Sequence, residues 1–367
     1  MNNKTQFLII VGILLICSCK EKDKGMDASL AFDRGALLQS ISKTIIMPAY
    51  DSSVFYFSIF SQSIQQFKHF QSEENLLEAQ QNWKQFARIW QYAAAFNFGP
   101  AAEKGIKKTL AEEIASFPVS SSKIESFILA KDTSFANFDR DARGIFAVEY
   151  LIFDEGLNST EILQKFTKDN WRMHYLLASV NHIGLNLNWV QTEWKTYQAS
   201  FVSNVGTDIG SSTSLLYNEF LKYYEGLKNF KFGIPLGRRP GQTTTLPAHV
   251  EAYYSGYSTN LAREHWKCVQ LIWSGTGLNG VQGIGFKSYL EKVEGGNALI
   301  TLTQNQVAAT QTKFDALPAG KLSDAINKDF ALVDELHTDL LKLTRFYKSD
   351  LSSLIGIAVT YSSGDGD

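Results

Sequence analysis

The sequence predicts an all-α protein made of two packed helical bundles. Between residues 74 and 96 apolar side chains recur at spacings of three, four and seven, which places them on one face of a helix of about six turns. These side chains are Leu76, Trp83, Phe86, Ala87, Trp90 and Ala94. Period-two alternation bounded by turn residues, the pattern typical of strands, is scarce. Helices are therefore expected to supply the core.

Other stretches with helical periodicity follow along the chain. They are residues 51–70, 170–198, 215–230, 258–273, 297–316 and 322–349. The Gly/Ser/Thr-rich residues 204–214 separate the earlier stretches from the later ones and are the best candidate boundary. We expect an N-terminal bundle at 30–205 and a C-terminal bundle with an acidic tail at 212–367. The two halves share no sequence period, so only their matching helix counts hint at an ancient duplication.

The N-terminus has the features of a signal peptide over residues 1–18. Lys4 precedes a ten-residue apolar run, residues 7–16, which is too short to span a bilayer. The following "ICSC" resembles a bacterial lipobox with Cys19 as the lipidated residue; a plain secretory signal or an N-terminal anchor is the alternative. Residues 19–29 then form a lipidated, charged tether. This predicts a bacterial cell-envelope protein held by lipid on the outer membrane, at its periplasmic face or at the cell surface.

Composition excludes some partners. The formal net charge is −2 and no basic cluster stands out, so nucleic-acid binding is not expected. Of three cysteines, one leaves with the signal and one takes lipid, so the mature chain is left with Cys268 and no intramolecular disulfide. Cys268 lies within "HWKCVQLIW" and is interpreted as a small buried apolar residue.

Several motifs are interpreted as structural. "GTGLNG" (275–280) fits the dinucleotide pattern, but a helical stretch precedes it instead of a strand, which predicts a loop. The six histidines form no ligand motif, and "SGDGD" (363–367) is too short for a calcium loop and is expected to be a solvated tail. The pair Arg238 and Arg239 could clamp an anion, although adjacent loop arginines are usually solvated. No metal site is predicted from these residues.

Glu149 is the one polar side chain between Ile145 and Phe153 in "RGIFAVEYLIF". A buried carboxylate must be paired, hydrogen-bonded, protonated or bound to a cation. Arg140 and Arg143 lie nearby in the sequence, and the loop arginines Arg238 and Arg239 are further candidates. Glu149 is thus either a brace between helices or part of a binding site, and both interpretations predict a perturbed pKa.

At this segment the chain resembles the imelysin-like family, whose signature is G-x-H-x-x-E. Gly144, Phe146 and Glu149 occupy the three signature positions here, followed by "YLIF". Similar blocks lie at 45–57, 82–100, 231–237, 246–261 and 348–367. The resemblance implies a two-domain, all-helical lipoprotein or periplasmic protein, a link to iron-responsive physiology and a cleft between the halves. The candidate cleft residues are Glu149, Glu251, Ser255, Ser258 and Asn260.

The chain departs from this pattern where metal chemistry would need it. The motif histidine is Phe146, and Ala94 stands where many relatives carry a glutamate. A single carboxylate hardly holds a catalytic zinc, although His182 could supply a ligand in space. We therefore expect a non-catalytic protein that binds a metal or another small ligand, with the cofactor unknown. There are two alternatives. One is a metal-dependent, peptidase-like hydrolase with a rebuilt site, and the other is a structural lipoprotein that docks a protein partner.

Overall fold

The computed structural model describes residues 32–104, 107–136 and 138–361. These residues form helices and connecting loops, and they contain no strand beyond two isolated bridges, Lys104 with Lys107 and Thr276 with Gln282. The all-α prediction is confirmed. The predicted signal peptide, the lipidation site Cys19, the tether and residues 363–367 lie outside the described residues. No helix in the described part of the chain is both long and apolar enough to cross a membrane.

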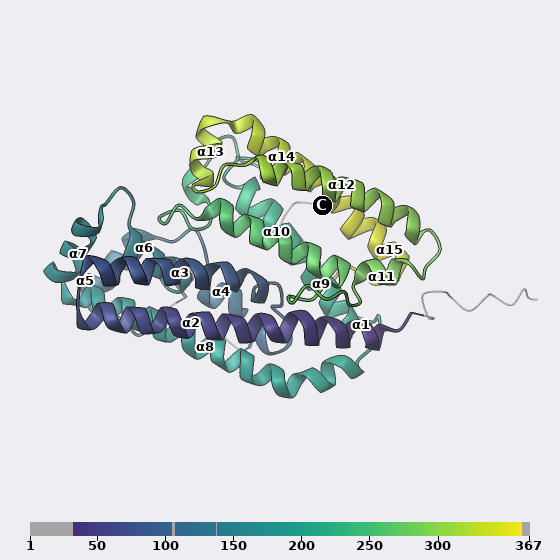
Figure 1. Cartoon of the computed structure of the whole chain (residues 1–367), viewed down its shortest axis with the longest axis horizontal. Coiled ribbons are helices and arrows are strands. Elements are labelled where there is room, and N and C mark those ends of the chain that lie inside the picture. Colours follow the sequence, from purple (N-terminus) through teal and green to yellow (C-terminus); the bar gives the residue numbers. More distant parts are fainter. Residues whose placement is uncertain (1–31, 105–106, 137, 362–367) are drawn as a thin grey trace, which may run out of the picture.

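The first half is built around the long helices α2, α3 and α8, with shorter helices at one end (Figure 1). Its elements are α1 (Arg34–Ile41), η2 (Ser42–Ile46), α2 (Met47–His69), α3 (Glu73–Ala93), η3 (Gly99–Ala101), α4 (Leu110–Ile114), α5 (Ser121–Ala130), η4 (Arg140–Ala142), α6 (Ile145–Phe153), α7 (Ser159–Lys168) and α8 (Asn170–Ser203). Ser72 begins α3 by accepting the N–H of Asn75, as N-capping serines do. The predicted stripe is buried from Leu76 to Trp90.

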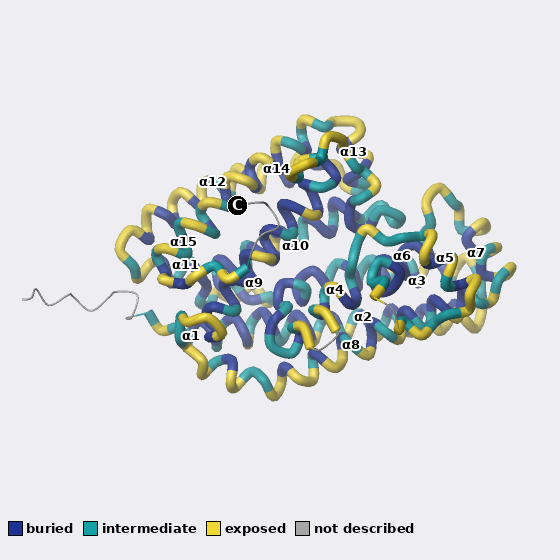
Figure 2. The backbone as a smooth tube through the Cα atoms, turned by 180° about the vertical axis from the view of Figure 1, so that it is seen from behind, coloured by how far each residue is buried: buried dark blue, intermediate teal, exposed yellow. Residues whose placement is uncertain are grey.

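The second half packs above the first in Figure 1. Its elements are α9 (Ser212–Glu225), η5 (Gly226–Gly233), η6 (Pro247–His249), α10 (Ser258–Ser274), α11 (Phe286–Leu290), α12 (Gly296–Ala316), α13 (Leu322–Lys328), α14 (Phe330–Thr344), η7 (Arg345–Asp350) and α15 (Leu351–Ile355). The loop between α8 and α9 falls within the Gly/Ser/Thr stretch that the sequence marks as a boundary. The helix faces turned toward the interior are buried and the outer faces exposed (Figure 2). Cys268 is fully buried on α10, as predicted.

The two halves meet where α3 packs against α10. Across this seam Arg88 forms an ion pair with Glu264 at 3.2 Å, and the Tyr92 hydroxyl donates to the same carboxylate. The Tyr223 hydroxyl donates to the backbone oxygen of Gln91 at 2.5 Å. The seam is therefore a polar and aromatic contact, and the candidate site lies along it.

Some predicted helix boundaries were wrong. The stretch predicted at 51–70 is the end of a longer helix that begins at Arg34 and passes through the π-helical turn η2. The stretch predicted at 322–349 is broken at Asp329, whose side chain caps α14 by accepting the Leu332 N–H.

As predicted, "GTGLNG" is a loop after a helix: α10 ends at Ser274, and Gly275 has a φ of 76°. A Cβ there would lie 2.2 Å from the backbone carbon of Ile284, so the loop requires glycine.

Candidate functional site

Gly144 sets the position of the motif helix α6. Its φ is +88°, and a Cβ on this residue would lie 2.4 Å from the backbone oxygen of Ile114. Only glycine allows this close approach between α4 and the start of α6. The motif glycine therefore fixes the point from which Phe146 and Glu149 project.

Glu149 is 1% exposed and connects the two halves. Its Oε1 accepts the backbone N–H of Ser255 at 2.7 Å, in the turn between η6 and α10. Burial raises the pKa of Glu149 to about 8; hydrogen bonds from Ser255 partly oppose this, and the charge of Glu251 adds to it. Glu149 is therefore protonated at neutral pH.

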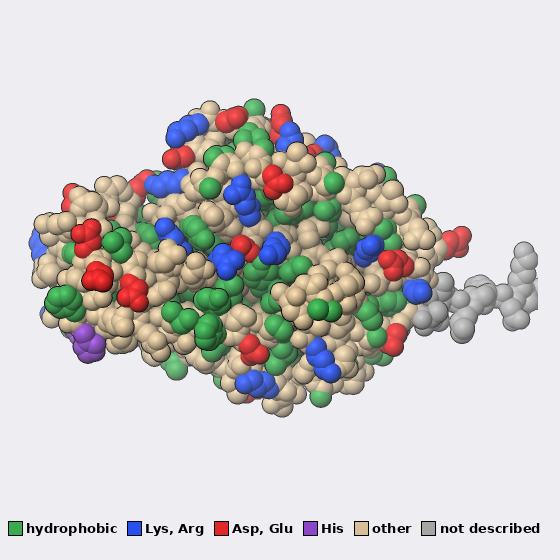
Figure 3. Space-filling model, in the orientation of Figure 1, with side chains coloured by type: hydrophobic (Ala, Val, Ile, Leu, Met, Phe, Trp, Pro, Cys, Tyr) green, Lys and Arg blue, Asp and Glu red, His purple; other side chains and the backbone are tan. Residues whose placement is uncertain are grey.

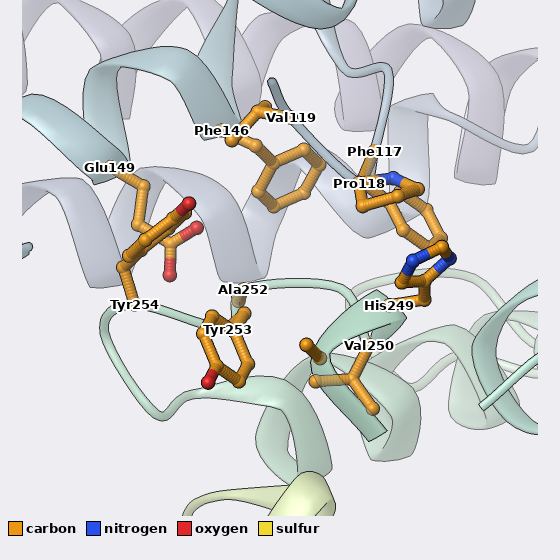
Figure 4. A pocket seen from close by; sticks show the side chains of 11 residues that line it. Phe117, Pro118, Val119, Phe146, Glu149, His249, Val250, Ala252, Tyr253 and Tyr254 are labelled. Atoms are coloured by element: carbon orange, nitrogen blue, oxygen red, sulfur yellow. The ribbon is translucent and has the colours of Figure 1, made fainter. Parts of the chain in front are cut away.

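Glu149 lines a cavity of about 200 Å³, the motif cavity. The cavity is lined by Phe117, Pro118, Val119, Phe146, Glu149, Ala248, His249, Val250, Ala252, Tyr253 and Tyr254. In Figure 4 the Glu149 carboxyl lies beside Tyr254, and the Phe146 ring lies between Glu149 and Pro118 in this view. The Phe146 ring packs edge-on against Trp83 and Phe117, with centroids 6.3 and 5.7 Å apart. Where the signature has histidine, this chain has an aromatic cluster.

A larger cavity of about 560 Å³, the central cavity, lies between the halves. Phe117 lines both cavities, so they adjoin. Four aromatic side chains contribute to its wall, namely Trp90, Phe117, Tyr223 and Phe230. Its polar wall consists of Gln91, Asn97, Glu103, Thr109, Glu112, Ser116, Glu219, Lys222, Lys231, Glu251 and His265. This size and mixture of aromatic and polar groups are typical of small-molecule sites.

Glu251 belongs to a closed polar triad in the wall of the central cavity. Lys231 Nζ lies 2.6 Å from Glu251 Oε2 and donates to Gln91 Oε1 at 2.6 Å. Gln91 Nε2 in turn donates to Glu251 Oε1 at 3.2 Å. Burial lowers the pKa of Lys231, and Glu251 opposes that shift. The triad joins α3, η5 and the turn after η6, so it couples the three elements that surround the cavity.

Two further side chains in this wall, Glu219 and His265, have shifted pKa values. Burial raises the pKa of Glu219, and Lys222, whose Nζ is 3.7 Å away, opposes the shift. His265 Nε2 lies 2.8 Å from the Tyr223 carbonyl oxygen, so this nitrogen carries the proton. Burial lowers the pKa of His265 well below its ordinary value, and Lys231 adds to the effect. The other nitrogen, Nδ1, is a buried acceptor without a hydrogen-bond partner among the described residues.

The predicted cleft residues separate into two groups. Glu149 lines the motif cavity and Glu251 lines the central cavity. Ser255, Ser258 and Asn260 line neither of them. The hydroxyls of Ser255 and Ser258 donate to Ala252 O at 3.4 and 3.3 Å, so both stabilise the turn that presents its N–H to Glu149.

The arginine partners proposed for Glu149 were wrong. Arg140 and Arg143 bind Glu113 instead, at 2.8 and 2.7 Å. Arg238 forms an ion pair with Asp334, and Arg239 stacks over Phe230.

His182 does not compensate for the missing motif histidine, because it lies against Phe135. Burial and Arg143 lower the pKa of His182 there, and Glu113 opposes the shift. The described residues contain no group of three or more His, Cys, Asp or Glu side chains that could hold a metal ion. The donor set around Glu149 thus does not fit a catalytic zinc, which needs three protein ligands.

Sequence reasoning missed Lys231, Gln91, Glu219 and His265. Lys231 had a detectable signal, because a lysine between Phe230 and Phe232 in "NFKFGIP" is, like Glu149, a charge inside an apolar run. Gln91, Glu219 and His265 lie on helices whose apolar periodicity is complete without them, so nothing in the sequence marks them. Their meeting depends on how the two halves pack.

The model of the imelysin family matches residues 46–345. The chain belongs to the imelysin family. A search of curated proteins gives no match.

Two solved structures share the imelysin fold over nearly the whole chain. One is described as an iron-regulated protein A precursor from Parabacteroides distasonis, with a TM-score of 0.72 and 15% identity, covering 88% of this chain and 95% of its own. The other is an imelysin-like protein from Psychrobacter arcticum, with a TM-score of 0.70 and 19% identity, covering 92% of this chain and 98% of its own. In this imelysin-family chain both departures from the family pattern face the cavities, Phe146 the motif cavity and Ala94 the central cavity.

Proposed function

We propose that this protein is a non-catalytic ligand-binding member of the imelysin family whose ligand occupies the central cavity. The observation that carries the proposal is the cavity itself, of about 560 Å³ and walled by aromatic rings and a buried polar triad. Four carboxylates and two lysines line it, so a ligand with hydrogen-bond donors or positive charge fits its wall better than an anion.

A binding role fits the groups at the motif better than hydrolysis. Glu149 holds its proton in the absence of a bound cation and accepts the backbone N–H of Ser255, so it acts as a hydrogen-bonding group between the two halves. Phe146 fills the motif position with a ring locked against Trp83 and Phe117. The similarity to a structure described as an iron-regulated protein A precursor supports an iron-related role, and we propose that this role is in uptake.

The test is native mass spectrometry of the full chain, purified without denaturation from the cells that make it. Ala94→Trp fills the central cavity, and Ala130→Trp, at the exposed end of α5, is the matched control. A bound small molecule is expected in the natural protein and in Ala130→Trp, and is expected to be lost in Ala94→Trp. Equal retention in both variants, or no adduct in any form, would contradict the proposal.

The same samples test the second candidate, a metal-dependent peptidase-like hydrolase with a rebuilt site. Elemental analysis that finds zinc or iron at one equivalent in the natural protein, and none in Glu149→Gln, would show the metal site that the hydrolase requires. We expect no metal that depends on Glu149.

The cell-envelope anchor forms part of the proposal, and it rests on the lipobox-like sequence before Cys19. Cys19→Ala is expected to move the protein from the detergent phase to the aqueous phase in detergent partitioning. Cys17→Ala is the matched control and should leave it in the detergent phase. Equal partitioning of both variants would contradict lipidation at Cys19.

A further inference from the structure

The wall of the central cavity contains an imidazole nitrogen that no group of the described residues satisfies. It is Nδ1 of His265, a residue of α10 that is 3% exposed. Nε2 of the same ring donates to the Tyr223 carbonyl oxygen, and the Tyr223 ring stacks on the imidazole with centroids 3.6 Å apart. One nitrogen and one face of the imidazole are therefore occupied, and Nδ1 is left as an acceptor. A buried acceptor without a partner is costly, and a donor on a ligand removes that cost.

Gly226 leaves the edge of this imidazole open. It follows α9 with φ −57° and ψ −43°, a right-handed helical conformation that any residue adopts. Beyond its own helix, the one described atom that a Cβ on Gly226 would meet within 4 Å is His265 Cε1, at 4.0 Å. Cε1 is bonded to Nδ1, and both residues line the central cavity. Glycine within a helix is less stable than alanine, and here the glycine is explained by the space it leaves beside Nδ1.

Five polar side chains of the cavity wall already use their hydrogen-bond donors within the chain. They belong to Gln91, Asn97, Thr109, Ser116 and Lys231. A ligand that presents only acceptors finds these donors taken. A ligand that presents a donor finds His265 Nδ1 open.

The four carboxylates of the wall also have partners. These are Lys231 for Glu251, Lys222 for Glu219, Lys108 for Glu103 and Thr109 for Glu112. Both lysines of the wall take part in these pairs. A charged ligand would lose its hydration in the cavity without gaining a free counter-ion from these groups, which favours an uncharged ligand. Acidic and basic side chains are also interspersed on the face of the molecule drawn in Figure 3, so the described part of that face has no broad field of one sign that would attract an ion.

We infer that the central cavity binds an uncharged, flat ring molecule whose N–H or O–H group donates to Nδ1 of His265. Four aromatic rings of the wall offer faces and edges to such a ring, namely Trp90, Phe117, Tyr223 and Phe230. The inference rests on the proposed function, because it names the class of ligand for the same cavity.

The experiment is calorimetric titration of the dialysed full chain with four probes: indole, 3-methylindole, 1-methylindole and tryptamine. The first two carry a ring N–H. 1-Methylindole has the same added methyl group as 3-methylindole but no N–H, and tryptamine adds a positive charge. We expect 1-methylindole and tryptamine to bind roughly tenfold or more weakly than 3-methylindole. Equal binding of the two methylindoles, or binding of tryptamine as tight as that of 3-methylindole, would overturn the inference.

Two variants test the role of Nδ1. His265→Gln keeps a donor for the Tyr223 carbonyl oxygen but lacks Nδ1, so the preference for 3-methylindole over 1-methylindole should fall below about twofold. His69→Gln, at the exposed end of α2, is the matched control and should keep the full preference. Gly226→Ala leaves His265 in place and suits a helix, so it tests the same contact without the risk of unfolding; its methyl group should weaken indole binding roughly tenfold. A full preference in both His265→Gln and Gly226→Ala would overturn the inference.

Ala94→Trp separates this inference from the proposed function. If it abolishes binding of all probes and these show no dependence on the N–H group, the central cavity still binds ligands and only the inference fails. N–H-dependent binding that Ala94→Trp leaves unchanged would place the probes elsewhere and overturn the inference. No binding of any probe to the unmodified chain would also overturn it, whereas the proposed function is then decided by the ligand retained in native mass spectrometry.

Discussion

Glu113 and Glu149 are two buried glutamates of the same half, and their surroundings differ in kind. Glu113, 5% exposed, is bound by Arg140 and Arg143. Burial would raise its pKa, but the Lys108 N–H and the two guanidinium groups outweigh burial and hold that pKa below its ordinary value. Glu149, 1% exposed, has a backbone N–H and a second carboxylate nearby, and its pKa rises to about 8.

The two glutamates differ because the nearby arginine side chains pair with only one of them. The arginines closest to Glu149 in the sequence turn toward α4 and serve Glu113, so the motif carboxyl remains neutral. One glutamate is therefore a structural anion, and the other is a neutral hydrogen-bonding group between the two halves. The motif position keeps its glutamate, but a cation that binds there has to displace its proton.

The largest expected effect comes from removing the negative charge of Glu113. Glu113→Gln should lower the free energy of unfolding by about 3–5 kcal/mol at pH 7, because Arg143 is left buried without its anion. Urea denaturation measures this change. Glu78→Gln, on an exposed helix position, is the control and should change the free energy by less than about 0.5 kcal/mol. A loss below about 1 kcal/mol for Glu113→Gln would show that the arginines find other acceptors.

Glu149→Gln tests the neutral carboxyl and should change the free energy of unfolding by an amount that depends on pH. The folded protein keeps the Glu149 proton up to about pH 8, whereas an ordinary glutamate releases it near 4.5. Folding therefore takes up a proton between these values, and stability falls as pH rises through this window. The glutamine variant lacks that loss, so it should match the natural protein at pH 5 and exceed its stability by roughly 4 kcal/mol at pH 9.

Denaturant melts at both pH values check this prediction. Glu78→Gln again controls for removal of one carboxylate. If Glu149→Gln destabilises the protein equally at pH 5 and pH 9, the carboxyl is ionised and paired in a way this account does not contain.

Phe146→His restores the family signature and should have an intermediate effect. The imidazole loses aromatic contact with Trp83 and Phe117 and enters a closed apolar site, at a cost of about 2 kcal/mol. Zinc should not recover the loss, because the described residues offer no complete ligand set. Thermal unfolding with and without zinc measures this, with Phe146→Leu as the control. Zinc stabilisation of Phe146→His alone would mean that the remaining ligands are still in place.

Ser258→Ala should have the smallest effect. Its hydroxyl donates to Ala252 O at 3.3 Å and lines neither the motif nor the central cavity. We expect a loss of about 0.5–1 kcal/mol in the free energy of unfolding, with ligand retention in native mass spectrometry unchanged. Lost retention at unchanged stability would assign Ser258 to the ligand site after all.

The sequence was sufficient for the fold and for part of the site. Helical periodicity predicted α3, α10 and α12 closely, because each carries a continuous apolar stripe, and a lone glutamate in an apolar run identified Glu149. The partners of the buried charges could not be predicted in this way. Lys231 meets Glu251 through packing of η5 against the turn after η6, and the arginines next to Glu149 in the chain point elsewhere. Sequence proximity is a poor guide to pairing when a π-helical turn or a loop sets the side-chain direction.

The most direct test of the central claim is the protonation state of Glu149 itself. Infrared difference spectroscopy between the natural protein and Glu149→Gln, recorded across pH, reports the carboxyl stretch of this residue. We expect a protonated carboxyl band at pH 6 and pH 7 that disappears with a midpoint near pH 8. A carboxylate band already present at pH 6 would contradict the account, because Glu149 would then be an ionised group available to bind a cation.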